Sequence, residues 1–243
     1  MVHPRTYGIF AYLGVFGAAF GGAALAAALL GDDSGRVWWP LSRLGSAGML
    51  EACGVTSLRV EGDQHLFGHG PSVVMVNHES LFDPAVVMRV AREPVRFVVK
   101  GQVRRTPIFG RALAAMGHVF VDRGEGDAAE ATLDRAARAI AEGRTVLVFP
   151  EGTRSEGGAL LPFRTGGARL ALRARVPIVP AALAGTGAIL PKHGGFQRRG
   201  PVAFVVGEPL PTASFEDATA LSRVAEERVE ALRRRARTLC DLA

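Results

Sequence analysis

The sequence predicts an α/β fold: a mostly parallel mixed sheet flanked by helices, with an N-terminal membrane-associated helical segment. From residue 56 onward, short β-rich runs alternate with helical stretches, an order that builds a largely parallel sheet covered on both faces. Residues 7–30 precede them as a run of 24 residues without a charge. The chain has 243 residues, 48% of them hydrophobic, which suffices for one sizeable core.

The uncharged run predicts a membrane anchor. As a helix it would be about 36 Å long, enough to cross a bilayer core of about 30 Å. The mean hydropathy of +0.19 also points to a membrane. We therefore divide the chain into a membrane-anchoring helical segment, residues 1–50, and an α/β domain, residues 51–243. A cleaved signal peptide and a buried hairpin packed on the domain are the alternatives for the run.

Two tryptophans, Trp38 and Trp39, follow the run directly. Interfacial aromatic residues collect at such a position next to a membrane span, so we expect the pair at the bilayer surface. The alternative is that both indoles pack against the core of the domain.

The expected strands are short runs rich in β-branched residues, bounded by turns and helical stretches. They are residues 58–60, 73–76, 96–99, 118–121, 146–149, 178–181 and 202–206. Pro177 and Pro180 suggest the beginning of a strand at 178–181 and its place at an edge or a bulge of the sheet, because proline cannot donate a ladder hydrogen bond.

The expected helices are residues 85–91, 108–115, 127–141, 166–175 and 218–239. The third is the clearest: Asp127 caps it, Leu133, Ala137 and Ile140 form one apolar face, and Gly143 stops it. The last carries an apolar stripe with four arginines around it, which favours a docked helix with a charged outer face. The alternative is a basic amphipathic helix that lies on an anionic membrane.

The charge balance favours anionic partners. The formal net charge is +6, and 27 of the 29 basic residues are arginines. Phospholipid headgroups, coenzyme A phosphates and nucleic acid would all suit such a chain. Nucleic acid is not an expected partner, since no reading helix or aromatic platform is recognisable. Cys53 and Cys240 are far apart, so neither a disulfide framework nor a zinc site is expected, and a reducing compartment suits the domain.

The central motif is residues 77–84, a polar turn between an apolar strand and a helix. Pro84 suits the first helical position and Asp83 the N-cap before it. On a continuous helix, His78 and Asp83 would lie about 140° apart, so they meet only if the backbone bends between them. A histidine backed by a carboxylate is the minimal apparatus of a general base. The alternative is that Asp83 is only a cap and His78 only a loop histidine.

This turn, Asn-His-Glu-Ser-Leu-Phe-Asp, resembles the N-H-x-S-x-x-D (H-x4-D) signature of the glycerolipid acyltransferases, most closely the 1-acylglycerol-3-phosphate acyltransferase family. Later segments are also similar to the family's blocks: 117–123, ending in Asp-Arg, 146–155 with Glu-Gly-Thr-Arg-Ser, 162–168 with Phe-Arg-Thr-Gly, and 176–183. The similarity covers about residues 58–207.

The resemblance implies roles for named residues. His78 and Asp83 would be catalytic. The implied substrate-binding residues are Asn77, Ser80, Arg123, Glu151, Gly152, Thr153, Arg154, Phe163, Arg164 and Gly166. No metal and no bound cofactor is required.

The implied reaction moves a fatty acyl group from acyl-CoA or acyl carrier protein to the free hydroxyl of 1-acylglycerol 3-phosphate, giving phosphatidic acid. The expected partners are therefore membrane lipid, a lysophospholipid acceptor and one of these donors. We expect the cell membrane as location, with the acyltransferase domain on the cytoplasmic face, because export would separate it from its donor. The alternatives are an acceptor that is another lysolipid or an amphipathic alcohol, and, remotely, a basic membrane-associated nucleic-acid-binding protein.

Overall fold

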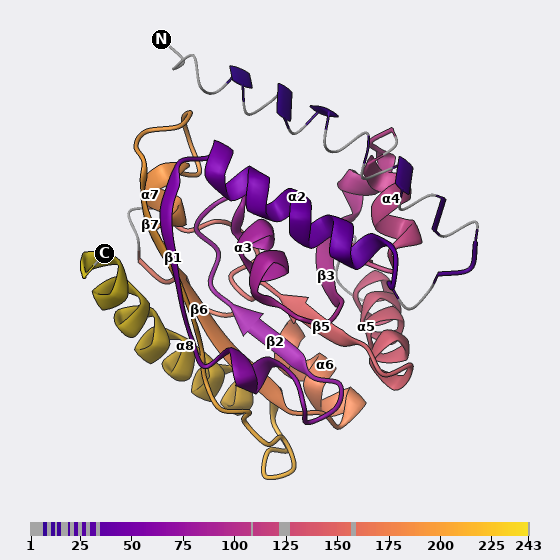
Figure 1. The fold of residues 1–243 in the computed structure, drawn as a ribbon. Helices are drawn as coiled ribbons and strands as arrows, with labels where there is room; N and C mark the ends of the chain where they lie inside the picture. Colours follow the sequence, from indigo (N-terminus) through magenta and orange to yellow (C-terminus); the bar gives the residue numbers. More distant parts are fainter. Residues whose placement is uncertain are drawn as a thin grey trace.

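The computed structural model describes residues 35–107, 109–121, 127–156 and 159–242, together with scattered positions between 7 and 32. Within them, one sheet of seven strands has the order β1-β7-β6-β2-β5-β3-β4 (Figure 1). The strands are β1 (Val55–Glu61), β2 (Val73–Val76), β3 (Val95–Lys100), β4 (Val119–Val121), β5 (Thr145–Val148), β6 (Ile178–Ala184) and β7 (Gly200–Val206).

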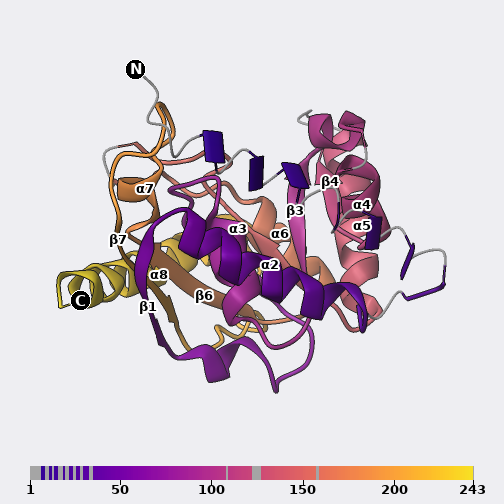
Figure 2. The same ribbon diagram turned by 45° about the horizontal axis from the view of Figure 1, so that its top comes forward.

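Helices cover both faces of the sheet. The α-helices are α2 (Trp38–Ala52), α3 (Asp83–Val90), α4 (Phe109–Ala115), α5 (Asp127–Ala141), α6 (Gly166–Ala174), α7 (Thr186–Ile189) and α8 (Ala218–Asp241). Helices α2, α3 and α4 share one hydrophobic cluster with the sheet, and α5, α6 and the start of α8 share another (Figure 2). Val74 and Val76 of β2 enter the first cluster, while Val73 and Met75 enter the second. This alternation is the two-residue period of a strand buried on both faces.

The predicted fold class is confirmed. Strands β6, β2, β5, β3 and β4 run parallel, whereas β7 pairs antiparallel with β6 and parallel with β1. The expected strands and helices all occur, with ends that differ by a few residues.

The expectation that the proline-containing strand lies at an edge is wrong. Strand β6 lies inside the sheet, between β7 and β2. The Pro180 carbonyl accepts a hydrogen bond from the Gly207 N–H (2.8 Å), just beyond the end of β7. Since the N–H and C=O of a strand residue point to the same side, the missing N–H of Pro180 falls where the antiparallel ladder has already ended.

The expectation for the tryptophan pair is also wrong. Trp38 and Trp39, the first two residues of α2, are 1% and 3% exposed and form part of the hydrophobic core. The Arg96 guanidinium lies 4.8 Å from the Trp38 ring centroid, and the His118 ring meets Trp38 edge-on. Packing two indoles over the sheet buries a large apolar area, which explains why they turn inward.

The N-terminal run is described only in part, because residues 9, 10, 13, 16–18, 20, 21, 24, 25, 28 and 29 lie outside the described residues. Among the positions described, the Tyr12 hydroxyl donates to the Gly45 carbonyl of α2 (3.1 Å), and Ala27 is buried in the core. In the part of the chain that the structure describes, no helix has the length and apolar character needed to span a bilayer.

Candidate active site

The site lies where neighbouring parallel strands end. Strand β2 pairs with β5 and with β6, so the segments that follow β2 and β5 meet at the same edge of the sheet. The first segment carries the turn from Asn77 to Asp83, and the second carries Phe149 to Ser155. Several predicted site residues are thereby brought together.

His78 and Asp83 form a direct pair. The distance between His78 Nδ1 and Asp83 Oδ2 is 2.8 Å. The Asp83 side chain is fully buried, while the His78 side chain is 19% exposed. With the Nδ1 proton donated to the carboxylate, Nε2 is the ring's acceptor, and no described residue bonds to it. The ring therefore presents a basic nitrogen to whatever enters the site.

Asp83 does not act as the N-cap of α3. It is the first residue of that helix, and its carboxylate turns back toward the preceding turn. Asp83 Oδ2 accepts from the backbone N–H groups of Glu79 (2.7 Å) and Ser80 (2.9 Å) as well as from His78. The carboxylate thus fixes the bend that brings a histidine five residues away into contact.

Phe149 holds the imidazole from its face. The two ring centroids are 4.2 Å apart and the planes are inclined by 19°. Sequence reasoning assigned Phe149 only to a strand, although an aromatic residue at a strand end directly before the Glu-Gly-Thr-Arg turn was a usable signal.

Glu151 links the two segments. Its carboxylate accepts from the His78 N–H (2.6 Å) and from the Leu161 N–H (2.9 Å), and it is 4% exposed. Burial raises the pKa of Glu151 above its usual value. The Ser155 N–H in turn donates to the His78 carbonyl (2.7 Å). In this structure Glu151 bonds to the backbone that carries the histidine.

Asn77 and Ser80 also bond within the protein. The Asn77 amide exchanges two hydrogen bonds with the Leu183 backbone of β6 (2.7 and 3.0 Å), as a strand residue would. The Ser80 hydroxyl donates to the Leu190 carbonyl (2.7 Å). Both residues are buried and anchor the turn to β6 and to the end of α7.

Glu79 is a buried carboxylate that sequence reasoning passed over. It is 7% exposed, and its oxygens lie 3.4 Å from the Asn77 amide nitrogen and the Gly187 N–H. Burial, and then the charge of Asp83, raises the pKa of Glu79 to about 7. A second ionisable carboxyl group therefore lies beside the His78–Asp83 pair.

Two arginines lie around the turn that follows β5. Arg154 is half-buried, and no described residue pairs with its guanidinium. Gly152 has φ +69°, and a Cβ there would lie 2.9 Å from Arg164 Nε, so the Arg164 side chain crosses this glycine closely. Thr153, in the same turn, is half-buried. This turn therefore carries donors on the same segment as Glu151 and Ser155, both of which bond to the His78 backbone.

The other predicted residues are placed as follows. Phe163 is half-buried, and its N–H donates to Glu226 (2.9 Å). Gly166 is exposed at the start of α6. The prediction for Arg123 lies outside the described residues. Among those described, no group of His, Cys, Asp and Glu could hold a metal ion.

Comparisons with known proteins show the family and the fold of the chain. The family model "Acyltransferase" matches residues 57–184. The crystal structure of the 1-acyl-sn-glycerophosphate (LPA) acyltransferase PlsC from Thermotoga maritima has the same fold, with a TM-score of 0.81 and 23% identity over 93% of this chain and 92% of that one.

Two curated relatives are named 1-acyl-sn-glycerol-3-phosphate acyltransferase. The protein from Cocos nucifera is 31% identical over 161 residues, 66% of this chain and 52% of its own length. The one from Limnanthes douglasii is 35% identical over 163 residues, 67% of this chain and 56% of its own. The chain thus spans about half the length of these relatives. Because the family model matches more than half of the chain, and the matched segment carries the site, the chain belongs to the acyltransferase family.

Proposed function

We propose that the protein transfers a fatty acyl group from acyl-CoA or acyl carrier protein to the free hydroxyl of 1-acylglycerol 3-phosphate, giving phosphatidic acid. One observation carries the proposal: His78 Nδ1 lies 2.8 Å from the buried carboxylate of Asp83, while Nε2 has no described partner. This is the arrangement of a general base with its orienting group. The names of the relatives support this acceptor.

The reaction is a direct transfer. His78 Nε2 takes the proton of the acceptor hydroxyl, and the hydroxyl oxygen attacks the thioester carbonyl carbon. The C–S bond then breaks, the new ester forms, and the thiolate leaves with the proton from the imidazolium. Asp83 stabilises the imidazolium between the two proton transfers. The stacked Phe149 ring holds the imidazole in the same orientation during both transfers.

We assign recognition of the acceptor phosphate to Arg154, with Arg164 of the same region and the sequence-predicted Arg123 as further candidates. A half-buried guanidinium whose described surroundings offer no counterion is suited to a phosphate monoester, which matches its planar fork. Asn77, Ser80 and Glu151 would shape this site rather than touch the phosphate, since their polar groups bond within the protein.

The acceptor and the product are membrane lipids, so we place the enzyme at the cell membrane with its catalytic domain on the cytoplasmic face. There it would meet both the lysolipid and the thioester donor. The reaction needs neither a metal nor a bound cofactor, and nucleic acid is not a partner in this proposal.

The test is acyl transfer by the purified protein to a panel of lysolipids with and without the phosphate. The wild type should prefer the phosphorylated acceptor, because a charge-assisted hydrogen bond contributes about 1.5 to 3 kcal/mol, roughly ten- to a hundredfold. Arg154→Lys keeps the charge and loses the fork, so it should weaken use of the phosphorylated acceptor alone. The exposed Arg228→Lys of α8 is the matched control. Equal turnover of both acceptors by the wild type would favour another lysolipid or an amphipathic alcohol as substrate.

A further inference from the structure

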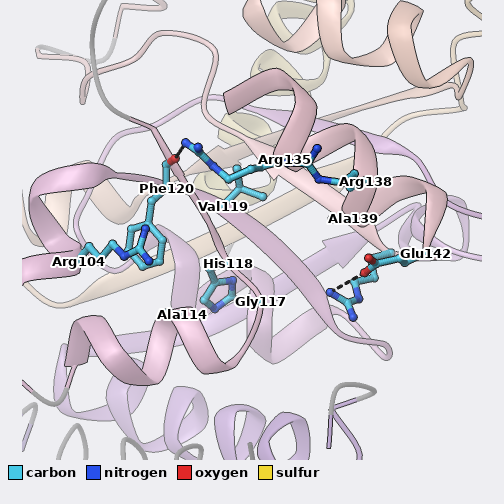
Figure 3. Close-up of a pocket in the computed structure, with 11 residues that line it drawn as sticks. Arg104, Ala114, Gly117, His118, Val119, Phe120, Arg135, Arg138, Ala139 and Glu142 are labelled. Carbon is cyan, nitrogen blue, oxygen red and sulfur yellow. Dashed lines mark hydrogen bonds and ion pairs between the residues drawn. The ribbon is translucent and has the colours of Figure 1, made fainter. Parts of the chain in front are cut away.

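A second cationic site lies at the open edge of strand β4, between α4 and α5. It is a pocket of about 300 Å³, and its walls carry Arg104, Arg135, Arg138 and Arg144 with a single carboxylate, Glu142 (Figure 3). Neither His78 nor Asp83 lines it. A concave site of this size with one sign of charge fits a small anionic group.

The charge of the pocket is only partly compensated. Glu142 lies 3.1 Å from Arg144, and Arg135 donates to the Phe120 carbonyl (2.9 Å). The Arg104 guanidinium lies 5.7 Å from the Phe120 ring centroid. No described residue pairs with Arg138, which is exposed on α5.

His118 lines the pocket as a neutral group. Its Nδ1 accepts from the Phe97 N–H (3.0 Å), and burial lowers the pKa of His118 to about 3. Four arginines and one glutamate therefore leave a net charge of +3 at neutral pH.

Strand register relates this pocket to the catalytic turn. Phe120 pairs with Val99, two residues beyond Phe97, which pairs with Leu147 of β5. Phe120 is therefore level with Phe149, the residue stacked on His78. Since neighbouring strands are about 4.8 Å apart, β4 lies about 10 Å from β5 and about 14 Å from β2. The end of the pocket at Phe120 thus lies at the same end of the sheet as the turn that carries His78. A long flexible linker can span the distance between them.

We propose that this arginine pocket binds the phosphate groups of coenzyme A, the nucleotide end of the acyl donor, while the pantetheine arm carries the thioester to His78. The inference rests on the proposed acyl transfer and names its donor. A concave pocket fits phosphate groups better than the convex surface of an acidic carrier protein. The phosphates are the chemistry that the guanidinium forks recognise.

The experiment compares three thioesters of one fatty acid: acyl-CoA, acyl-pantetheine without phosphates, and acyl carrier protein. The test variant is Arg104→Gln with Arg138→Gln, and Arg111→Gln on the exposed face of α4 is the matched control. The test variant should raise KM for acyl-CoA about tenfold or more and leave turnover of acyl-pantetheine unchanged. The pair Arg104→Lys and Arg138→Lys should give a smaller loss, and thermal melts should confirm that all variants fold.

A binding measurement separates this proposal from the proposed function. Titration with coenzyme A alone should show a dissociation constant about tenfold or more higher for the test variant than for the wild type and the control. That result stands even if no lysolipid is acylated, whereas normal transfer with unchanged coenzyme A binding overturns the pocket alone. An equal loss with acyl-CoA and acyl-pantetheine, or a loss confined to acyl carrier protein, also overturns it. So does reduced binding to phosphatidylglycerol vesicles with coenzyme A binding intact, which would assign the pocket to lipid headgroups.

Discussion

One oxygen atom organises the catalytic turn. Asp83 Oδ2 accepts from the His78 ring and from two backbone N–H groups, while Oδ1 is buried with no hydrogen-bond partner among the described residues. A buried carboxylate oxygen without a partner costs free energy of folding. The turn is therefore locally unfavourable for folding, and the packing of the surrounding sheet and α3 must offset this free energy. Such local strain is common at functional sites.

Glu79 should make the stability of the fold depend on pH. Its pKa is raised from the usual 4.5 to about 7, chiefly by burial and then by the charge of Asp83. Between these values the folded state holds a proton on Glu79 that the unfolded state releases, so this group contributes a fall in the free energy of unfolding of up to about 3 kcal/mol as pH rises from about 4.5 to about 7. His118 contributes the opposite sign up to its unfolded pKa of 6.5, because its folded pKa is lowered to about 3. Glu79→Gln removes the falling contribution, so in denaturant titrations the stability of the variant should rise more steeply with pH between about 4.5 and 7 than that of the wild type.

The control for this prediction is Glu93→Gln, which alters an exposed carboxylate. It should leave the pH slope as it is in the wild type. A Glu79→Gln protein whose stability has the same pH dependence as the wild type would contradict the assignment of this contribution to Glu79.

Among the elements, α2 shows where sequence reasoning failed. Residues 1–50 were expected as a membrane-anchoring helical segment, and the part around Gly45 and Gly48 reads as mixed in polarity, so a separate helix packed on the domain was not expected there. In the structure these glycines leave room for the Tyr12 side chain. The Tyr12 hydroxyl donates to the Gly45 carbonyl, and a Cβ at Gly48 would collide with this hydroxyl. Tertiary packing therefore decides the element, and that information is not local.

Asp32 stabilises the start of α2. Its carboxylate accepts from the backbone N–H groups of Gly35 (3.0 Å), Arg36 (3.0 Å) and Val37 (2.8 Å). Asp32→Ala should lower the free energy of unfolding by about 1 kcal/mol, as the loss of a helix cap does. Urea denaturation measures this, with the exposed Glu216→Ala as control. Equal stability of the two variants would show that the turn before α2 holds without this carboxylate.

Removal of residues 1–31 tests the role of the N-terminal segment. The deletion keeps Asp32 and the domain, and it should move the protein from the membrane fraction to the soluble fraction, because the uncharged run is the expected anchor. A thermal melt should show that the truncated domain still folds. If the truncated protein stays in the membrane fraction, the basic surface would be the main membrane-binding element. If the full-length protein is recovered as a mature chain without the run, the run would be a signal peptide.

At the scale of the whole molecule, the sequence was sufficient for the fold class but not for the strand order. Short β-rich runs identified the strands, most clearly where a strand is buried on both faces, as with Val73 to Val76. The positions of β6 and β7 depend on pairing between segments far apart in the chain, and the proline in β6 misled the prediction.

The site was predictable to a similar extent. The strand-to-turn pattern and the resemblance together picked out His78 and Asp83, which the fold places in contact. The contacts of Glu151 and Phe149 with His78 could not be predicted, since they depend on the pairing of β2 with β5. The pocket at β4 combines segments from η2 (Gly101–Arg105), β4 and α5. Only residues 117–120 of its lining belong to a segment singled out from the sequence as similar to a family block, and the arginines that give the pocket its charge lie outside that segment.

The central claim is that His78 acts as the general base of acyl transfer. The most direct test is the rate of phosphatidic acid formation from acyl-CoA and 1-acylglycerol 3-phosphate. The rate is measured for the purified wild type, for His78→Ala and, as control, for His193→Ala, which alters an exposed histidine. Thermal melts show that all three proteins are folded. A general base contributes about 10² to 10⁴ in rate, so His78→Ala should lose at least about 99% of the activity while His193→Ala retains it. A His78→Ala enzyme that keeps more than about a tenth of the wild-type rate would contradict the account.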